Sequence, residues 1–167
     1  YLDALFEATS GLTTTGASLV IDLEHISYAD NMWRFTMHLI GGLGLIVIAL
    51  TLGIFGKATS GLYSSEGRSE HVLPNIVNTV RLISQISLGV IGVATIVLFV
   101  FCMLGGFDPL RGFLNALWMA VSGFMTAGFS PTSQSVMYYH SFAFEVVCIV
   151  LMLLGAVNFA LFVKIRQ

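Results

Sequence analysis

The chain has 167 residues, of which 56% are hydrophobic and 10% are charged, and its formal net charge is −2. Soluble globular domains contain about 45–50% apolar and about 25% charged residues. The composition therefore excludes an ordinary soluble domain and indicates an all-α membrane protein, with the lipid bilayer as its surroundings and no nucleic acid as a partner.

The first expected element is a short helix over residues 2–12, followed by the polar tract Thr-Thr-Thr-Gly at residues 13–16. A helix of that length covers roughly 16 Å, about half of a hydrocarbon core. This favours a re-entrant element over a membrane span. Because the chain starts at Tyr1 with neither a signal peptide nor a span, we expect it to be an internal piece of a longer protein.

Three later segments, residues 36–55, 86–104 and 141–163, contain no charged residue except Glu145 near the start of the last one. Such lengths cover roughly 28–35 Å, enough to cross a bilayer. Small residues let helices approach closely in membranes. We expect this role for Gly41, Gly42, Gly44, Gly53 and Gly155.

Residues 57–83 are expected to form a linker between the first two spans, polar from 59 to 71 and amphipathic after Pro74. Basic residues gather on this side of the spans, whereas Arg34 and Arg111 lie on the other side together with several acids. The basic set comprises Lys57, Arg68, Arg81, Lys164 and Arg166. By the positive-inside rule the linker and the C-terminus are cytoplasmic.

An internal repeat relates residues 3–18 to residues 115–130 without a gap, at a constant offset of 112 positions. A second short helix is therefore expected over residues 112–124, again before a span. The identical pairs are Ala4/Ala116, Leu5/Leu117, Ala8/Ala120, Ser10/Ser122, Gly11/Gly123, Thr14/Thr126, Gly16/Gly128 and Ser18/Ser130.

The repeated Thr/Gly tract has a chemistry that suits a dehydrated cation. Non-helical backbone at membrane depth must be buried in protein or must line a water-filled path. Successive carbonyl groups can replace the hydration shell of potassium, and glycine permits the dihedral angles that turn them inward. The alternative is that Gly16 and Gly128 are ordinary helix C-caps before external loops.

At these residues the sequence resembles the Trk/Ktr/HKT superfamily of potassium transporters, over essentially the whole chain. Residues 6–17 look like a first-repeat pore loop, residues 33–47 like the span after it with its Gly-Gly-x-Gly, and residues 122–131 like a second-repeat filter. Residues 158–161 look like the end of the second span of that repeat. The resemblance implies potassium-channel-like span–pore loop–span repeats with re-entrant pore helices, in a multi-pass protein of the cell membrane, the bacterial inner membrane in particular.

The resemblance also implies the site and the domains. Potassium would be held by backbone carbonyls of Thr14, Thr15 and Gly16 and of Thr126, Ala127 and Gly128. Residues 1–56 would be the pore loop and second span of repeat 1, 57–83 the linker, and 84–167 all of repeat 2. The remaining pore repeats, a second copy in a homodimer, and cytoplasmic nucleotide-binding regulatory subunits are the implied partners, with no organic cofactor. A plain connector is the alternative role of the linker.

Other residues are candidates with plainer alternatives. Glu7 in the first short helix could bond backbone behind the filter, and its counterpart is Met119. His38 could relay protons but is expected to be a packing or hydrogen-bonded residue. Cys102 and Cys148 are expected to be packing residues, because no metal-binding spacing accompanies them.

Potassium uptake driven by the membrane potential, about 2.3 kcal/mol per charge per 100 mV, is the leading functional prediction. Glycine at both filter positions favours potassium, while a sodium-conducting or cation-coupled member of the superfamily is the nearest alternative. A secondary transporter of a small organic solute would need charged or aromatic anchors that the tracts lack. No catalysis is expected, because Glu7, His38 and Glu145 have no recognised catalytic spacing.

Overall fold

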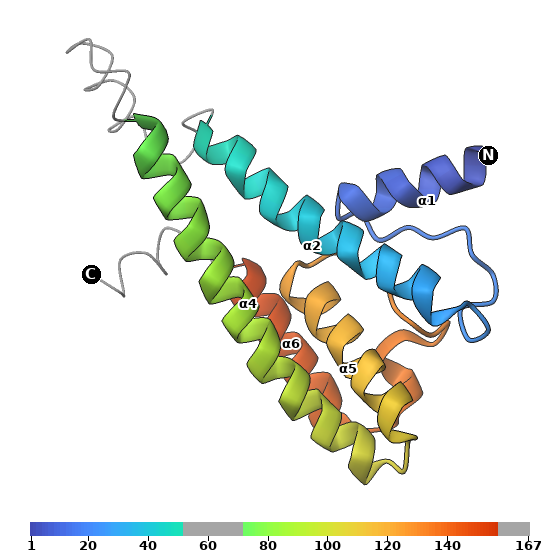
Figure 1. The fold of residues 1–167 in the computed structure, drawn as a ribbon. Helices are drawn as coiled ribbons and strands as arrows, with labels where there is room; N and C mark the ends of the chain where they lie inside the picture. The colour runs from blue at the N-terminus through green and yellow to red at the C-terminus, as the bar shows by residue number, and fades with distance from the viewer. Residues whose placement is uncertain (52–71, 157–167) are drawn as a thin grey trace. The chain divides into compact units, whose positions relative to one another are not determined.

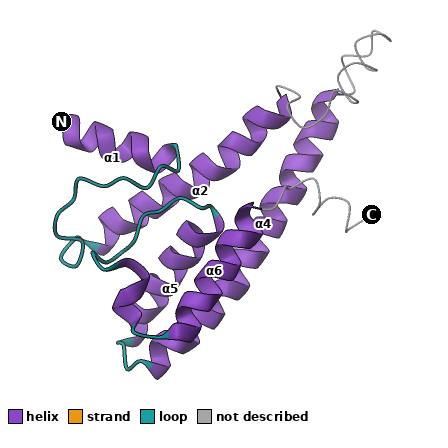
Figure 2. Cartoon of the chain, turned by 180° about the vertical axis from the view of Figure 1, so that it is seen from behind, coloured by secondary structure: helices purple, strands orange, loops and turns teal. Residues whose placement is uncertain are grey.

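The computed structural model describes residues 1–51 and 72–156, and within these ranges it contains helices and no strands (Figures 1 and 2). The all-α prediction is therefore confirmed for the described residues. In chain order the elements are α1 (Leu2–Leu12), α2 (Tyr28–Thr51), α4 (Val72–Leu104), α5 (Pro109–Phe124), the 3-10 helix η2 (Ser135–Tyr139) and α6 (Phe142–Ala156).

The two short helices end where the repeat predicts, at Leu12 and Phe124. Helix α1 also begins as predicted, but α5 begins at Pro109 instead of residue 112. Proline suits the first turn of a helix because it has no N–H to leave unpaired. The Asp108 side chain caps the same turn by accepting a hydrogen bond from the Arg111 amide at 3.3 Å.

The longer helices cover most of the expected spans. Residues 80–104 of α4 form a helix that is long and apolar enough to cross a membrane, with a mean hydropathy of 2.6. Helix α6 is a shorter apolar helix. Residues 72–83 of the expected linker belong to α4. The rest of the linker, Gly53 and the C-terminal basic residues lie outside the described residues.

The described chain forms two compact units, and the candidate site lies wholly within the first. This first unit comprises residues 1–42 and the described residues from 89 onward, and the second is made from described residues between 43 and 88. The first unit therefore holds α1, the start of α2, the end of α4, α5, η2 and α6.

Helix α5 forms the core of the first unit. Its Trp118 ring stacks on Phe35 of α2, with ring centroids 5.7 Å apart and planes 10° apart. Its Phe113 meets Phe99 of α4 edge to face at 5.9 Å. The equivalent helix α1 is far more exposed, since Phe6 keeps 43% of its surface accessible whereas Trp118 keeps 2%.

Glycines let both short helices touch the span that follows them. A Cβ atom added at Gly41 of α2 would fall on the carbonyl group of Leu12, and one at Gly155 of α6 would fall on that of Phe124. Leu12 and Phe124 are equivalent residues of the repeat. The predicted close approach is thus confirmed at these two glycines and at Gly42, where a Cβ would overlap the Met125 side chain. At Gly44 the described residues place no atom within 4 Å of such a Cβ, so the close approach stays a prediction there.

Candidate functional site

The first Thr/Gly tract leaves α1 through a Schellman turn, the arrangement that ties the last carbonyls of a helix to the next two amides. The Thr14 amide donates to the Gly11 carbonyl at 3.3 Å, and the Thr15 amide donates to the Ser10 carbonyl at 3.0 Å. Thr14 has a φ of 52° and therefore lies in the left-handed region.

The second tract leaves α5 through the same turn. The Thr126 amide donates to the Gly123 carbonyl at 3.2 Å, the Ala127 amide donates to the Ser122 carbonyl at 2.9 Å, and the φ of Thr126 is 50°. The C-cap residues are Thr13 and Met125, and each is followed by a left-handed threonine, Thr14 or Thr126. The alternative that Gly16 and Gly128 are the C-caps is wrong.

Gly16 and Gly128 lie two residues after these left-handed threonines and have φ angles of 79° and 88°. A Cβ atom on Gly16 would lie 2.5 Å from the Ala127 carbonyl oxygen and 2.7 Å from Gly128 Cα. One on Gly128 would lie 3.0 Å from Gly16 Cα. The two tracts, 112 positions apart in sequence, therefore meet backbone to backbone, with no room for a side chain between them.

This geometry is suited to coordinating a cation. Within each tract, residues of positive φ alternate with residues of ordinary φ, at Thr14 and Gly16 and again at Thr126 and Gly128. Alternation of this kind allows successive carbonyl groups to point to the same side of the chain, where they can surround an ion. The C-termini of α1 and α5, the negative ends of their dipoles, lead directly into the tracts.

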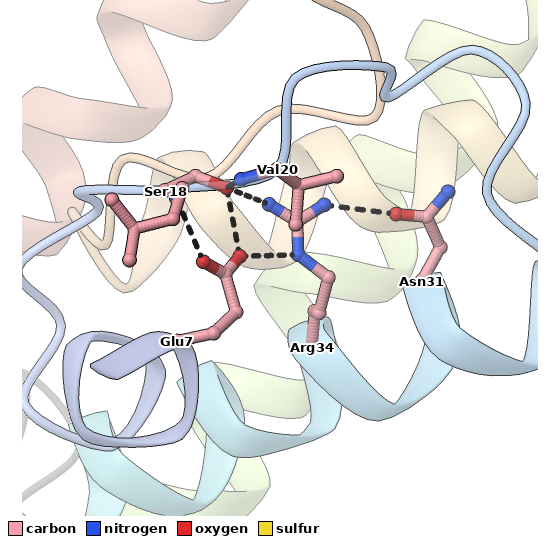
Figure 3. Close-up of polar contacts among 6 residues, drawn as sticks. Glu7, Ser18, Val20, Asn31 and Arg34 are labelled. Atoms are coloured by element: carbon pink, nitrogen blue, oxygen red, sulfur yellow. Dashed lines mark hydrogen bonds and ion pairs between the residues drawn. The ribbon is translucent and has the colours of Figure 1, made fainter. Parts of the chain in front are cut away.

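A polar cluster ties the first tract to α1 and α2 (Figure 3). Arg34 Nε donates to Glu7 Oε1 at 2.9 Å, and the two side chains are only 5% and 13% exposed. The same carboxylate accepts from Ser18 Oγ at 2.8 Å and from the Leu19 amide at 3.1 Å. The expected bond from Glu7 to nearby backbone is therefore present. Arg34 also donates to Asn31 Oδ1 at 3.0 Å and to Ser18 Oγ at 3.2 Å.

The second tract continues into Phe129, which packs against α2. The guanidinium carbon of Arg34 lies 4.3 Å from the centroid of the Phe129 ring. The His38 ring, one helical turn later, lies 4.3 Å from the same ring. The Phe129 carbonyl accepts from Ser122 Oγ at 2.6 Å. His38 is fully buried, and its ring contacts are those expected of a packing residue.

The loops that follow the two tracts are joined by Glu24. Its carboxylate accepts from the Ser133 amide at 3.0 Å and from the Ser133 hydroxyl, and these bonds lower the pKa of Glu24. In the same loop His25 Nδ1 lies 2.9 Å from the Asp22 carboxylate, which raises the pKa of His25 above its ordinary value. His25 is exposed to solvent and Glu24 is half-buried.

The remaining candidates form no second site. Cys102 and Cys148 are free thiols, 1% and 2% exposed, as expected of packing residues. Among the described residues no cluster of three or more His, Cys, Asp or Glu could hold a metal. The contacts of Arg34 with Glu7 and Phe129 were not predicted from the sequence. An arginine just before an apolar helix segment, together with the acid Glu7 in α1, was the available signal.

The chain matches the TrkH family, described as "Cation transport protein", over residues 1–166. It is 33% identical to the Trk system potassium uptake protein TrkG of Escherichia coli K12, covering 96% of this chain and 33% of that protein. It is 31% identical to the Trk system potassium uptake protein TrkH of Vibrio parahaemolyticus, covering 95% of this chain and 32% of that protein.

A solved structure agrees with this relationship. The crystal structure of the potassium transporter TrkH from Vibrio parahaemolyticus matches with a TM-score of 0.72 at 28% identity, over 95% of this chain and 30% of that one. The chain therefore spans about one third of the length of these relatives. The family match over nearly every residue, together with a shared fold, establishes that this chain belongs to the TrkH family of cation transport proteins.

Proposed function

We propose that this chain supplies two filter loops of a larger pore-forming subunit that takes potassium up across the cell membrane. The carbonyl ligands would come from Thr14, Thr15 and Gly16 and from the equivalent residues Thr126, Ala127 and Gly128. The observation that carries the proposal is the backbone contact between Gly16 and Gly128 at the ends of two equivalent turns.

The lengths of the two short helices support a re-entrant path. Helix α1 has 11 residues and α5 has 16, which correspond to about 16 and about 24 Å. Both are shorter than a hydrocarbon core of about 30 Å. Each helix would enter the membrane, end at the filter with its negative dipole end toward the ion, and return through the tract to the outside.

Two loops cannot close a ring around an ion, so the rest of the pathway has to come from outside this chain. The TrkG and TrkH relatives are about three times as long as the chain, which leaves room for further repeats of the same kind. From the family we also infer a homodimer, cytoplasmic nucleotide-binding regulatory subunits as partners, and a location in the bacterial inner membrane. In this arrangement residues 57–83 and the C-terminus face the cytoplasm.

Substitution of the filter glycines tests the proposal. Rubidium uptake and its competition by sodium would be measured in potassium-starved cells that carry the full-length protein with Gly16→Ser or Gly128→Ser. Both variants should lose discrimination of rubidium over sodium. Gly16→Ser should lose more, because its new Cβ meets backbone atoms at 2.5 and 2.7 Å. Gly106→Ser is the matched control, since Gly106 also has a positive φ of 77° but has open space around it.

If both glycine variants reach the membrane and discriminate as the wild type does, the filter assignment fails. Sodium uptake equal to rubidium uptake in the wild type would instead favour the sodium-conducting alternative. Uptake of an organic solute without either ion would favour the secondary transporter.

A further inference from the structure

The buried arginine of α2 contacts both candidate filter loops at once. We propose that Arg34 is a positioning residue that sets the separation of the two loops and thereby the discrimination between ions. This inference deepens the proposed function and rests on it. It assigns a role to a charged group that does not itself touch the ion.

On the side of the first loop, the contact is an ion pair extended by hydrogen bonds. Arg34 and Glu7 meet at 2.9 Å, and both bond the hydroxyl of Ser18, which lies two residues after Gly16. The second carboxylate oxygen of Glu7 accepts from the Leu19 amide at 3.1 Å. The segment that follows Gly16 is therefore fixed to α1 and α2 by three bonds, two to Glu7 and one to Arg34.

On the side of the second loop, the contact is made through a ring. Phe129 directly follows Gly128, is 2% exposed, and lies 4.3 Å from the Arg34 guanidinium carbon. A cation over an aromatic face is attracted to it, and more strongly when both are desolvated. The His38 ring also lies against Phe129. Two side chains of α2 therefore contact the residue that directly follows Gly128.

The charge balance of the cluster suits a cation pathway. An unpaired guanidinium behind the filter would repel a passing cation, whereas pairing with Glu7 neutralises it. Removing one partner of a buried pair leaves the other charge buried and uncompensated. Lysine keeps the charge but lacks the planar fork that serves Glu7, Asn31 and Ser18 together.

The second repeat has no such device. The counterpart of Glu7 is Met119, and the counterpart of Ser18, Ser130, places its hydroxyl 4.0 Å from the Met119 sulfur. The charged contact is thus absent from the symmetric position of the repeat. The ion pair therefore belongs to the first loop and to its contact with the second loop. Because the second loop lacks a matching pair, the two loops can be tested separately.

The test measures rubidium uptake and sodium competition in potassium-starved cells that carry the full-length protein. Arg34→Gln and Glu7→Gln should each reduce the discrimination of rubidium over sodium on the order of tenfold, since a displacement of about 1 Å at a site of fixed geometry can cost up to about a hundredfold. Arg34→Lys should restore part of it. The double variant Glu7→Gln with Arg34→Gln should be less impaired than either single variant, because no unpaired charge remains.

Two controls separate this inference from the proposed function. Arg111→Gln removes an arginine outside the cluster and should leave discrimination as in the wild type. Gly16→Ser is measured in parallel. If Gly16→Ser alters discrimination but Arg34→Gln does not, the filter stands and the role of Arg34 is overturned. If neither does, the proposed function itself fails.

A variant that does not reach the membrane is replaced by one that preserves packing. Phe129→Leu keeps an apolar side chain beside α2 and removes only the ring that Arg34 contacts. The His38 contact with this ring is weakened as well. The variant should reduce the discrimination of rubidium over sodium by less than Arg34→Gln would. Unchanged discrimination in both Phe129→Leu and Arg34→Lys, at wild-type amounts in the membrane, would also overturn the proposal.

Discussion

At the scale of single residues, the most unusual feature is a threonine in the left-handed conformation at the end of each short helix. Thr14 and Thr126 have φ angles of 52° and 50°, which β-branched residues rarely adopt. Such a conformation costs about 1–3 kcal/mol and persists only where the surroundings impose it. Here the two hydrogen bonds that backbone amides donate in each Schellman turn impose this conformation. The glycines two positions later then turn the backbone again.

Glu24 provides a prediction at the same scale, because it joins the loops that follow the two tracts. Its pKa is lowered from the ordinary 4.5 mainly by the bond from the Ser133 side chain. A carboxylate of lowered pKa stabilises the contact above its unfolded pKa and loses that contribution as the pH falls through the folded value. Glu24→Gln should therefore reduce protection of the Ser133 amide from hydrogen exchange at neutral pH.

The difference between Glu24→Gln and wild type should shrink as the pH falls below the ordinary carboxyl pKa, and disappear below the lowered pKa of Glu24, where this carboxyl is protonated. Hydrogen exchange measured by mass spectrometry on the peptide that contains Ser133, with both proteins at each pH, follows this difference. Asp22→Asn serves as a control in the same loop, since Asp22 pairs with His25 and not with Ser133. A difference that is constant from pH 7 to pH 3 would contradict the assignment.

At the scale of elements, each short helix ends against the following span at a glycine. The contacts of Gly41 with Leu12 and of Gly155 with Phe124 occupy the same place in the two repeats. They set how closely the tract that follows each helix can approach its span. The repeat is therefore preserved in the helix crossing as well as in the turn that follows it.

Alanine at either crossing should destabilise the protein. The added methyl group of Gly41→Ala or Gly155→Ala would fall on a backbone carbonyl, and overpacking of this kind costs about 1–3 kcal/mol or more. Thermal unfolding of the purified full-length protein in detergent measures the effect. Gly92→Ala is the matched control within α4, because nothing lies within 4 Å of its new Cβ and alanine favours a helix by about 1 kcal/mol. Equal melting temperatures for Gly41→Ala and Gly92→Ala would refute the crossing.

At the scale of the whole molecule, the internal repeat made most of the site predictable. Residues 3–18 and 115–130 share the side chains that form each turn, so their alignment identified both short helices and paired Gly16 with Gly128. The Glu7–Arg34 pair could not be predicted in this way. Its partners are 27 positions apart, and the contact depends on how α2 folds back along α1. The role of Phe129 depends on the packing of two loops that are distant in sequence.

Side chains of α1 and α5 also differ in a way that the repeat alone does not predict. Trp118 and Phe124 are buried, at 2% and 1%, while their counterparts Phe6 and Leu12 remain 43% and 46% exposed. Helix α5 packs against α4, where Phe113 meets Phe99 edge to face at 5.9 Å. Burial therefore depends on neighbours that the aligned residues do not encode.

Binding of an ion to peptide oxygens where the two tracts meet can be tested by anomalous scattering from crystals of the full-length protein grown with rubidium. We expect a rubidium peak in coordinating contact with carbonyl oxygens from both tracts, residues 14–16 and 126–128, and its loss in Gly16→Ser. A filter region without a peak, or a rubidium ion held only by side chains elsewhere in the protein, would rule out this binding site.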